Sequence, residues 1–250
     1  MNLHESWRII RGVARSLRIY YGDEARRDAM DAFYREFVRS GDLVFDIGAH
    51  VGDRTACFRR LGARVIAVEP QPALVRTLKW MYGRDRNVVI EPVAVCRRTG
   101  TLELKLNLDN PTVSTASAAL IAAARNAAAW QRQVWIASVH VPAITIDDLI
   151  ARHGRPRFIK IDVEGYEAEA LGRLTQSVDA LSFEFTTIQR DVALACLQRC
   201  TALGYRRFKA ALGESQRYEH DQWQGVGAMG EWITTLPDDA NSGDIYARLG

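Results

Sequence analysis

The sequence predicts a single α/β domain, in which helices cover both faces of a mostly parallel sheet. From residue 43 onward, short runs rich in Val and Ile alternate with stretches of helical character. These runs are apolar at almost every position, which is typical of strands buried on both faces. With 250 residues, of which 48% are hydrophobic and 25% charged, the chain has the size and composition of one globular α/β unit with insertions.

Charge and composition exclude several classes of protein. The formal net charge is only +3 and no local basic patch stands out, which argues against a nucleic-acid partner. No segment approaches the ~20 apolar residues of a membrane span, and the N-terminus lacks the core of a signal peptide. The four cysteines form no CxxC pair, so reduced core thiols are favoured over a disulfide or a metal site. We therefore expect a cytoplasmic protein without integral membrane association.

Residues 1–39 are expected to form an N-terminal helical extension. Apolar residues recur every three or four positions between residues 3 and 21, beside a stripe of arginines. The apolar stripe consists of Leu3, Trp7, Ile10, Ala14, Leu17 and Tyr21. We expect this helix to pack on its own domain; a membrane surface, a partner, or a lid over an active site is the alternative. A second helix is expected over 23–38, ending at Ser40 and Gly41.

Residues 40–250 are expected to form the sheet and its helices. The expected strands are LVFDIG (43–48), RVIAVEP (64–70), NVVIEPVAV (87–95), FIKIDVEG (158–165), ALSFEF (180–185) and YRRFKA (205–210). The expected helices cover 55–62, ended by Gly62, 73–82, a stretch from residue 166, and 191–203. TLELKL (101–106) is expected to form a short hairpin arm, and GEWITTL (230–236) is a candidate antiparallel partner of the last strand.

Two insertions, at about 107–140 and 211–229, interrupt this alternation. The first combines a polar loop with an alanine-rich stretch, which predicts a helix from Ala118 to about Trp135. Inserted loops of this architecture are natural places for substrate selection. After the first insertion, Thr145 and Asp148 have the spacing of a helix capping box, which favours a helix start over a functional cluster.

The segment VFDIGAHVGDRT (44–55) is the most informative part of the chain. A strand that enters a glycine turn and then a helix lets the backbone approach a ligand, because Gly48 and Gly52 have no side chain. The dinucleotide fingerprint would read GxGxxG here, but the spacing is Asp46-x-Gly48-x-x-x-Gly52. A carboxylate at Asp46 repels a diphosphate and suits a cationic ligand. S-adenosylmethionine fits, since it has a sulfonium, an ammonium and no phosphate.

Further acidic residues follow the other strands. Glu69 ends the second strand, where a carboxylate can accept both ribose hydroxyls of a nucleoside. Asp162 and Glu164 follow FIKI, and Glu184 lies within LSFEF. The carboxyl ends of parallel strands open onto one crevice, so these acids and Asp46 are expected to converge on one pocket. The alternative is structural: caps, strand ends and charges at helix N-termini.

A buried carboxylate within an apolar strand is costly unless it is paired, so Glu184 is expected to have a partner. Lys160 shares a strand face with Asp162, two residues away. Lys160 is therefore expected to pair with Asp162 or Glu184, either as structure or to position a catalytic group.

Several segments, in this order along the chain, carry a family resemblance. They are DIGAHVG, VEP, PVAV with RTGTLEL, VPAITIDDL, FIKIDVEGYEAEAL and LSFEF, over about residues 40–210. The chain resembles the FkbM family of S-adenosylmethionine-dependent methyltransferases, and KIDVEGYE is the most specific part. The resemblance implies the class I methyltransferase fold, a Rossmann-like seven-stranded sheet whose last strand is antiparallel. It also implies O-methylation of sugars, polyketides or other secondary metabolites.

The resemblance further implies roles for single residues. Asp46, Gly48 and Gly52 would line the methionine part of the cofactor, and Glu69 would hold the ribose. Val93 and Ala94 would lie near the adenine, and Asp162 and Glu164 near the transferred methyl. The expected cofactor site therefore consists of Asp46, Gly48, Ala49, Gly52, Glu69, Pro70, Val93, Ala94, Asp162 and Glu164.

The expected catalytic residues are Asp162, His50 and Lys160. Methyl transfer is an in-line displacement, in which a base must take the proton of an acceptor hydroxyl. Asp162 and His50 are the candidates for the base, although a local hydrogen bond is the plainer interpretation of His50. Asp162 and Glu164 alone fall short of a ligand set for Mg²⁺ or Ca²⁺, so no metal is expected.

The expected partner is a small-molecule or glycan acceptor. A methyltransferase that acts on a flipped base would need a string such as [DN]PP[YF] after FIKID, and VEGY does not supply it. A homodimer is an open alternative. The rival functions are a non-catalytic cofactor-binding or interaction module on the same fold and an NAD-dependent oxidoreductase.

Overall fold

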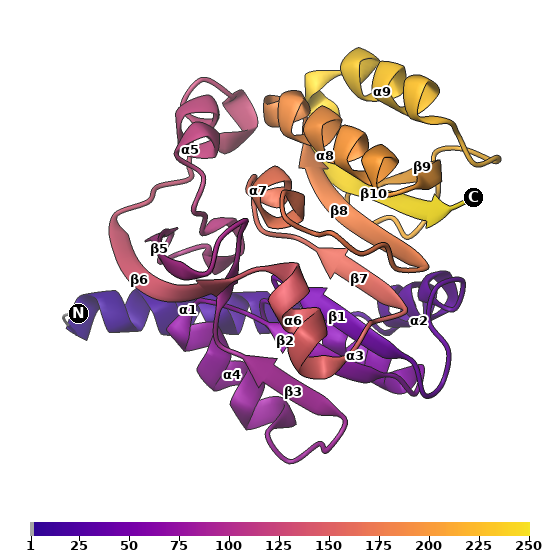
Figure 1. Ribbon diagram of the computed structural model, residues 1–250. Coiled ribbons are helices and arrows are strands. Elements are labelled where there is room, and N and C mark those ends of the chain that lie inside the picture. The colour runs from indigo at the N-terminus through magenta and orange to yellow at the C-terminus, as the bar shows by residue number, and fades with distance from the viewer. Residues whose placement is uncertain (1–2) are drawn as a thin grey trace.

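Seven strands form the central sheet in the order β3–β2–β1–β7–β8–β10–β9 (Figure 1), in a computed structural model that describes residues 3–250. The strands are β1 (Leu43–Ile47), β2 (Arg64–Val68), β3 (Val88–Glu91), β7 (Phe158–Ile161), β8 (Ala180–Thr186), β9 (Tyr205–Leu212) and β10 (Ser242–Leu249). Neighbours from β3 to β8 pair in parallel, whereas β10 runs antiparallel to both β8 and β9. This is the class I methyltransferase topology, as the resemblance implies.

Helices cover both faces of this sheet, because successive strand side chains point to opposite sides. In β1, Phe45 and Ile47 join one hydrophobic cluster and Val44 joins another. The first cluster is covered by α6 (Ile146–His153), α7 (Glu167–Leu171), α8 (Arg190–Ala202) and α9 (Val226–Thr235). The opposite face is covered by α2 (Glu24–Tyr34), α3 (Asp53–Arg60) and α4 (Pro72–Tyr82). Figure 1 shows α8 and α9 over the end of the sheet that holds β8 to β10.

A second sheet of three strands adjoins the carboxyl ends of β1 and β2. It has the order β4–β6–β5, from β4 (Ala94–Val95), β5 (Gly100–Leu106) and β6 (Ala137–Ile144). The strand expected over 87–95 is thus two strands in two sheets. Residues 101–106 were expected to form a short hairpin arm. Instead, β5 pairs antiparallel with β6, a strand that lies further along the chain and that the sequence did not predict.

Two helix predictions are also corrected. The alanine-rich helix α5 (Ala118–Ala124) is shorter than expected, because the chain then turns to bring Trp130 and Trp135 inward. Their indole nitrogens donate to Asn241 and to the carbonyl of Val113. Residues 230–235 belong to helix α9 and not to a strand, since the buried Met229 and Ile233 lie one helical turn apart. The antiparallel partner of β9 is therefore β10.

Other local predictions are confirmed. Thr145 caps α6 in a capping box with Asp148, whose carboxylate accepts from the backbone of Thr145. All four cysteines are buried and free.

The helix expected over 23–38 is shorter than predicted, since α2 ends at Tyr34 and turns follow it. Within residues 3–250, no helix combines the length and the apolar character needed to cross a bilayer.

The first helix, α1 (Leu3–Tyr21), packs with a different face from the expected one. Gly12 and Ser16 are buried, and a Cβ at Gly12 would lie 2.8 Å from the ring of Pro111. Trp7 and Ile10, from the predicted stripe, are 65% and 57% exposed. The side chain of Leu3 lies outside the described part, as do residues 1 and 2 of the predicted extension.

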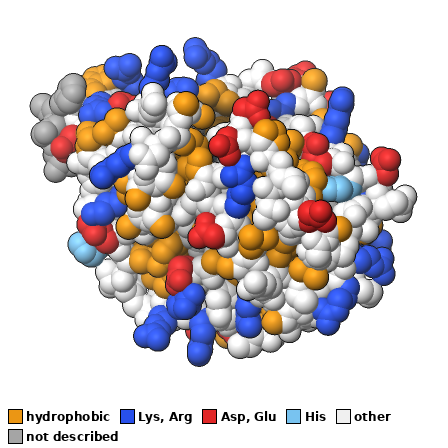
Figure 2. All heavy atoms as spheres, turned by 90° about the horizontal axis from the view of Figure 1, so that it is seen from above, with side chains coloured by type: hydrophobic (Ala, Val, Ile, Leu, Met, Phe, Trp, Pro, Cys, Tyr) orange, Lys and Arg blue, Asp and Glu red, His pale blue; other side chains and the backbone are white. Residues whose placement is uncertain are grey.

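Charge is dispersed over the surface that Figure 2 shows. Most of the Lys and Arg side chains lie near the rim of this view, and acidic side chains lie among hydrophobic ones closer to its centre. This distribution agrees with the small net charge of the sequence.

Candidate active site

A cavity lies at the carboxyl ends of β1, β2 and β7, where β4 and β5 form a further wall. We call it the donor cavity. Every residue of the predicted site except Gly52 lines it. The expected convergence of acids is therefore met for Asp46, Glu69, Asp162 and Glu164, whereas Glu184 lines a neighbouring cavity.

The glycine turn after β1 is shaped by contact with β7. Gly48 has a φ of +81°, which L-residues with side chains rarely adopt, and a Cβ there would lie 1.7 Å from the carbonyl oxygen of Asp162. The backbone nitrogen of Asp162 donates to Ile47 at 2.9 Å, next to this turn. Gly48 thus permits the two strand ends to meet at the floor of the donor cavity.

The presence of glycine at residue 52 has a structural cause that the sequence did not reveal. It precedes α3 with a φ of +83°, and a Cβ there would lie 2.8 Å from Leu78 and from the ring of Tyr82. The structure places Gly52 in the contact between the turn and α4, and not on the donor cavity. Its expected part in lining the cofactor stays a prediction, to which this packing contact adds a structural role.

Asp46 is 1% exposed and accepts a hydrogen bond of 2.5 Å from the hydroxyl of Thr55. Burial raises the pKa of Asp46 to about 6, although Thr55 partly counteracts this effect. Thr55 was not predicted. Its place one turn after Gly52, in the first turn of α3, is the pattern that could have identified it.

Glu69 is held by two backbone donors. The nitrogen of His50 donates to Oε2 at 2.9 Å, and the nitrogen of Gln71 donates to Oε1 at 2.8 Å. Burial raises the pKa of Glu69 to about 8 despite these bonds. Each oxygen keeps a lone pair, so the fixed carboxylate can accept two hydroxyls of one ligand.

His50 lies in the same turn with a φ of +50°. Its Nε2 is 3.4 Å from the hydroxyl of Thr112, and its ring packs edge-on against Tyr20 with centroids 5.4 Å apart. Burial lowers the pKa of His50, so the ring is neutral at pH 7. This contact reaches a residue 62 positions further along the chain, so it is not the local bond that the sequence suggested, and the role of His50 as a base stays a prediction.

Lys160 is 1% exposed and bonds two acids, Asp162 at 2.9 Å and Asp244 at 3.1 Å. Burial lowers the pKa of Lys160, but the two carboxylates more than offset this effect and the pKa stays well above its ordinary value. The protonated side chain therefore cannot act as a base. Of the two expected partners Asp162 is confirmed and Glu184 is wrong, while Asp244, on β10, was not predicted.

A second cavity adjoins the donor cavity, and we call it the acceptor cavity. Tyr20, Arg54, Asp162, Glu164 and Glu214 line both cavities. The two predicted insertions supply further lining residues, among them Trp130, Gln133 and Gly213. The insertions thus form part of the wall of this second cavity.

A network of ion pairs, exposed at Glu214 and buried at Arg54, holds the loop after β9 over both cavities. Arg54, which is 7% exposed, bonds Asp53 at 2.5 Å and Glu214 at 2.6 Å. Arg26, on α2, forms an ion pair with the same carboxylate of Glu214, with a nitrogen–oxygen distance of 3.0 Å, and lies over the ring of Tyr20. The N-terminal helices are therefore part of the site wall, and none of these residues was predicted from the sequence.

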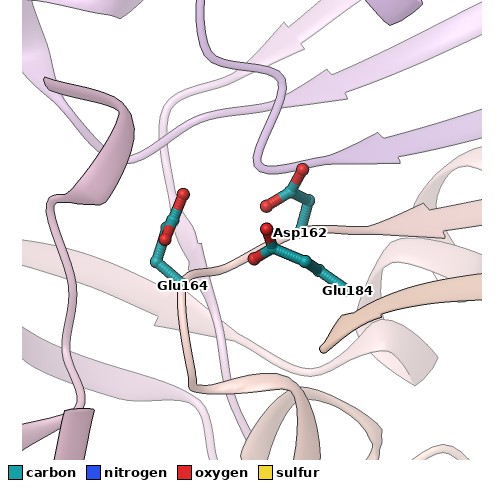
Figure 3. A group of neighbouring side chains, drawn as sticks. All are labelled: Asp162, Glu164 and Glu184. Atoms are coloured by element: carbon teal, nitrogen blue, oxygen red, sulfur yellow. The ribbon is translucent and has the colours of Figure 1, made fainter. Parts of the chain in front are cut away.

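Three carboxylates meet at the boundary of the two cavities (Figure 3). Oxygen atoms of Asp162, Glu164 and Glu184 all lie within 4.8 Å of one another. The expected partner of Glu184 is missing among the described residues, because its buried Oε2 has no hydrogen bond. Burial and the neighbouring acids raise the pKa of Glu164 and of Glu184 well above the ordinary value.

Comparisons with known proteins give one family and several distant structures. The family model described as Methyltransferase FkbM domain matches residues 46–221. No curated protein matches the chain significantly. Solved structures align over most of both chains with low identity. They include a precorrin-6y C5,15-methyltransferase from Geobacter metallireducens (13% identity, 90% of this chain and 87% of that chain, TM-score 0.43), a TehB-like SAM-dependent methyltransferase from Corynebacterium glutamicum (9%, 89% and 88%, 0.43) and a precorrin 8W decarboxylase from Methanobacterium thermoautotrophicum (13%, 90% and 90%, 0.44).

Proposed function

Because the chain belongs to the FkbM family of S-adenosylmethionine-dependent methyltransferases, we propose that it methylates a hydroxyl oxygen of a sugar or another secondary metabolite, free or within a glycan. The observation that carries this proposal is the pair of adjoining cavities with Asp162 and Glu164 at their boundary. A methyl donor in one cavity and an acceptor in the other would meet at these carboxylates.

The donor cavity fits S-adenosylmethionine by charge. Asp46 is buried and lies beside the glycine turn, so it would attract the cationic methionine part and repel a diphosphate. Glu69 presents two fixed oxygens that suit the ribose hydroxyls. The apolar wall at Val93, Ala94 and Val95 suits the flat adenine ring.

The transfer itself needs orientation and a proton acceptor. An oxygen lone pair of the acceptor attacks the methyl carbon, the carbon–sulfur bond breaks, and its electron pair stays on the sulfur, which becomes a neutral thioether. Asp162 is the favoured base for the hydroxyl proton, because it lines both cavities and Lys160 holds one of its oxygens in place. His50 lines only the donor cavity. Lys160 is thus a positioning residue for Asp162.

Calorimetry and turnover test this function. We expect micromolar binding of S-adenosylmethionine and S-adenosylhomocysteine and no comparable binding of NAD. Labelled donor is then offered to pools of sugars, glycans, polyketides and phenols, and we expect label on an oxygen of one class. Tight NAD binding without adenosyl binding would support an oxidoreductase instead. Donor binding with no transfer to any pool would favour a non-catalytic module.

A further inference from the structure

The carboxylates of Asp162, Glu164 and Glu184, which we call the acidic trio, come from two neighbouring parts of the fold. Asp162 and Glu164 follow the end of β7, and Glu184 lies on the adjacent strand β8. Figure 3 shows the carboxylates of Asp162 and Glu184 facing each other, with Glu164 beside them. One oxygen from each lies within 4.8 Å of the other two.

Two members of the acidic trio have no partner to offset their burial. Glu164 is 8% exposed and lines both cavities, yet among residues 3–250 no donor bonds its carboxylate. Glu184 has a buried Oε2 that is equally unpartnered in the described chain. Leaving buried carboxylate oxygens unsatisfied is costly, and buried polar atoms without partners are rare in folded proteins.

The nearest cation does not supply the missing partner. Lys160 donates to Asp162 and to Asp244 and makes no hydrogen bond to either glutamate. Only one oxygen of Asp162, Oδ2, is engaged by Lys160, which leaves Oδ1 available toward the glutamates. The three acids therefore form a site with free carboxyl oxygens, whose mutual repulsion a bound cation would offset once they are ionised.

The donor atoms select the class of cation. Carboxylate oxygens without His or Cys are the ligands of hard cations such as Mg²⁺, Mn²⁺ and Ca²⁺. Oxygens bound to such an ion at about 2.0 to 2.6 Å lie about 3 to 5 Å from one another across cis and trans positions. The upper limit of 4.8 Å within the acidic trio is compatible with this range.

We propose that Asp162, Glu164 and Glu184 bind one hard divalent cation at the boundary of the donor and acceptor cavities. Three carboxylates leave coordination positions for water and for an oxygen of a bound acceptor. The ion would then orient that oxygen toward the methyl donor, a role that rests on the proposed function. The binding of the ion itself does not depend on that function.

The first test uses the metal alone. The full chain, stripped with EDTA and dialysed, is titrated with Mg²⁺, Mn²⁺ or Ca²⁺ by calorimetry, and bound Mn²⁺ is followed by the loss of the free-ion EPR signal. We expect one ion per chain with a dissociation constant of about 1 mM or below for at least one of the three. No saturable binding in that range overturns the proposal, and it means that protons or an acceptor ammonium offset these charges.

Matched variants locate the ion. Glu164→Gln and Glu184→Gln are each expected to weaken Mn²⁺ binding by about tenfold or more. Glu169→Gln is the control: its carboxylate is 36% exposed and pairs with Arg97 on the surface, so we expect a change of less than about threefold. Wild-type affinity in both trio variants overturns the proposal, as does an equal loss in the control.

Thermal unfolding shows whether the variants are folded, so that a loss of Mn²⁺ affinity can be distinguished from a loss of the fold. Each trio variant removes one of three mutually repelling carboxylates, so in EDTA both variants should melt at or above the wild-type temperature. Added Mn²⁺ should raise the melting temperature of the wild type more than that of the variants at the same concentration. Binding of S-adenosylmethionine in EDTA is measured separately, so that failure of the metal site and failure of the proposed function remain distinguishable.

Discussion

Lys160 donates a hydrogen bond of 2.9 Å to Asp162, two residues further along the chain and at the boundary of the two cavities. The ammonium group is 1% exposed and also bonds Asp244, on β10. The two hydrogen bonds of Lys160 tie the end of β7 to β10, which runs antiparallel to its neighbours in the sheet. Asp162 is thereby held by one oxygen while its other oxygen faces the site.

Replacement of Lys160 by Met should destabilise the protein by about 3 to 5 kcal/mol, because two carboxylates would lose their buried cation. Urea unfolding followed by circular dichroism measures this loss. Lys105→Met is the control, since Lys105 forms an exposed pair with Glu103 that solvent screens. An equal loss of unfolding free energy in both variants would show that the buried ion pairs of Lys160 stabilise the protein no more than an exposed pair does.

Replacement of Gly48 by Ala should destabilise the fold by about 3 kcal/mol or more, since the new Cβ would clash with the backbone of Asp162 and φ is +81°. Gly100→Ala, where open space surrounds the Cβ and φ is ordinary, should change the free energy of unfolding by less than about 0.5 kcal/mol. Denaturant titration of both variants gives the comparison. A harmless Gly48→Ala would contradict the close approach of β1 and β7.

Glu69 should make the stability depend on pH. Its pKa is about 8 in the folded chain and lower when unfolded, so the unfolded state loses this proton first as pH rises. The free energy of unfolding should therefore fall between about pH 5 and 8, with a contribution of at most about 1.4 kcal/mol per pH unit. The free energy of unfolding of the Glu69→Gln variant should fall less steeply over this pH interval. Parallel slopes for the two proteins would place the titration on another group.

Asp162→Asn should lower kcat for methyl transfer by a factor of about 10² to 10⁴, because the hydroxyl proton would lose its acceptor. The amide keeps an oxygen for Lys160, and binding of S-adenosylmethionine should change little. His50→Gln should have a smaller effect on kcat, since His50 does not line the acceptor cavity. The opposite order, measured by single-turnover transfer, would assign the base to His50.

Much of the donor site was predictable from local patterns. Glycine at residue 48, a carboxylate two residues before it and another at the end of the next strand all belong to short segments with a fixed strand–turn geometry. The residues that close the acceptor side were not predictable. Arg54, Glu214 and Asp244 lie far apart in the sequence and meet only through packing of α3, the loop after β9 and β10.

The sequence by itself determined the sheet with its helices, the glycine turn and the acids at the strand ends, because hydrophobic periodicity and turn chemistry act over a few neighbouring residues. Tertiary structure alone decided which charges pair. Lys160 bonds Asp244 rather than Glu184, and Gly52 serves packing against α4, because such contacts depend on the register of distant elements. The convergence of Glu184 with Asp162 and Glu164 was expected from the strand ends, but the pairing of β7 with β8 decided that these three carboxylates lie within 4.8 Å of one another.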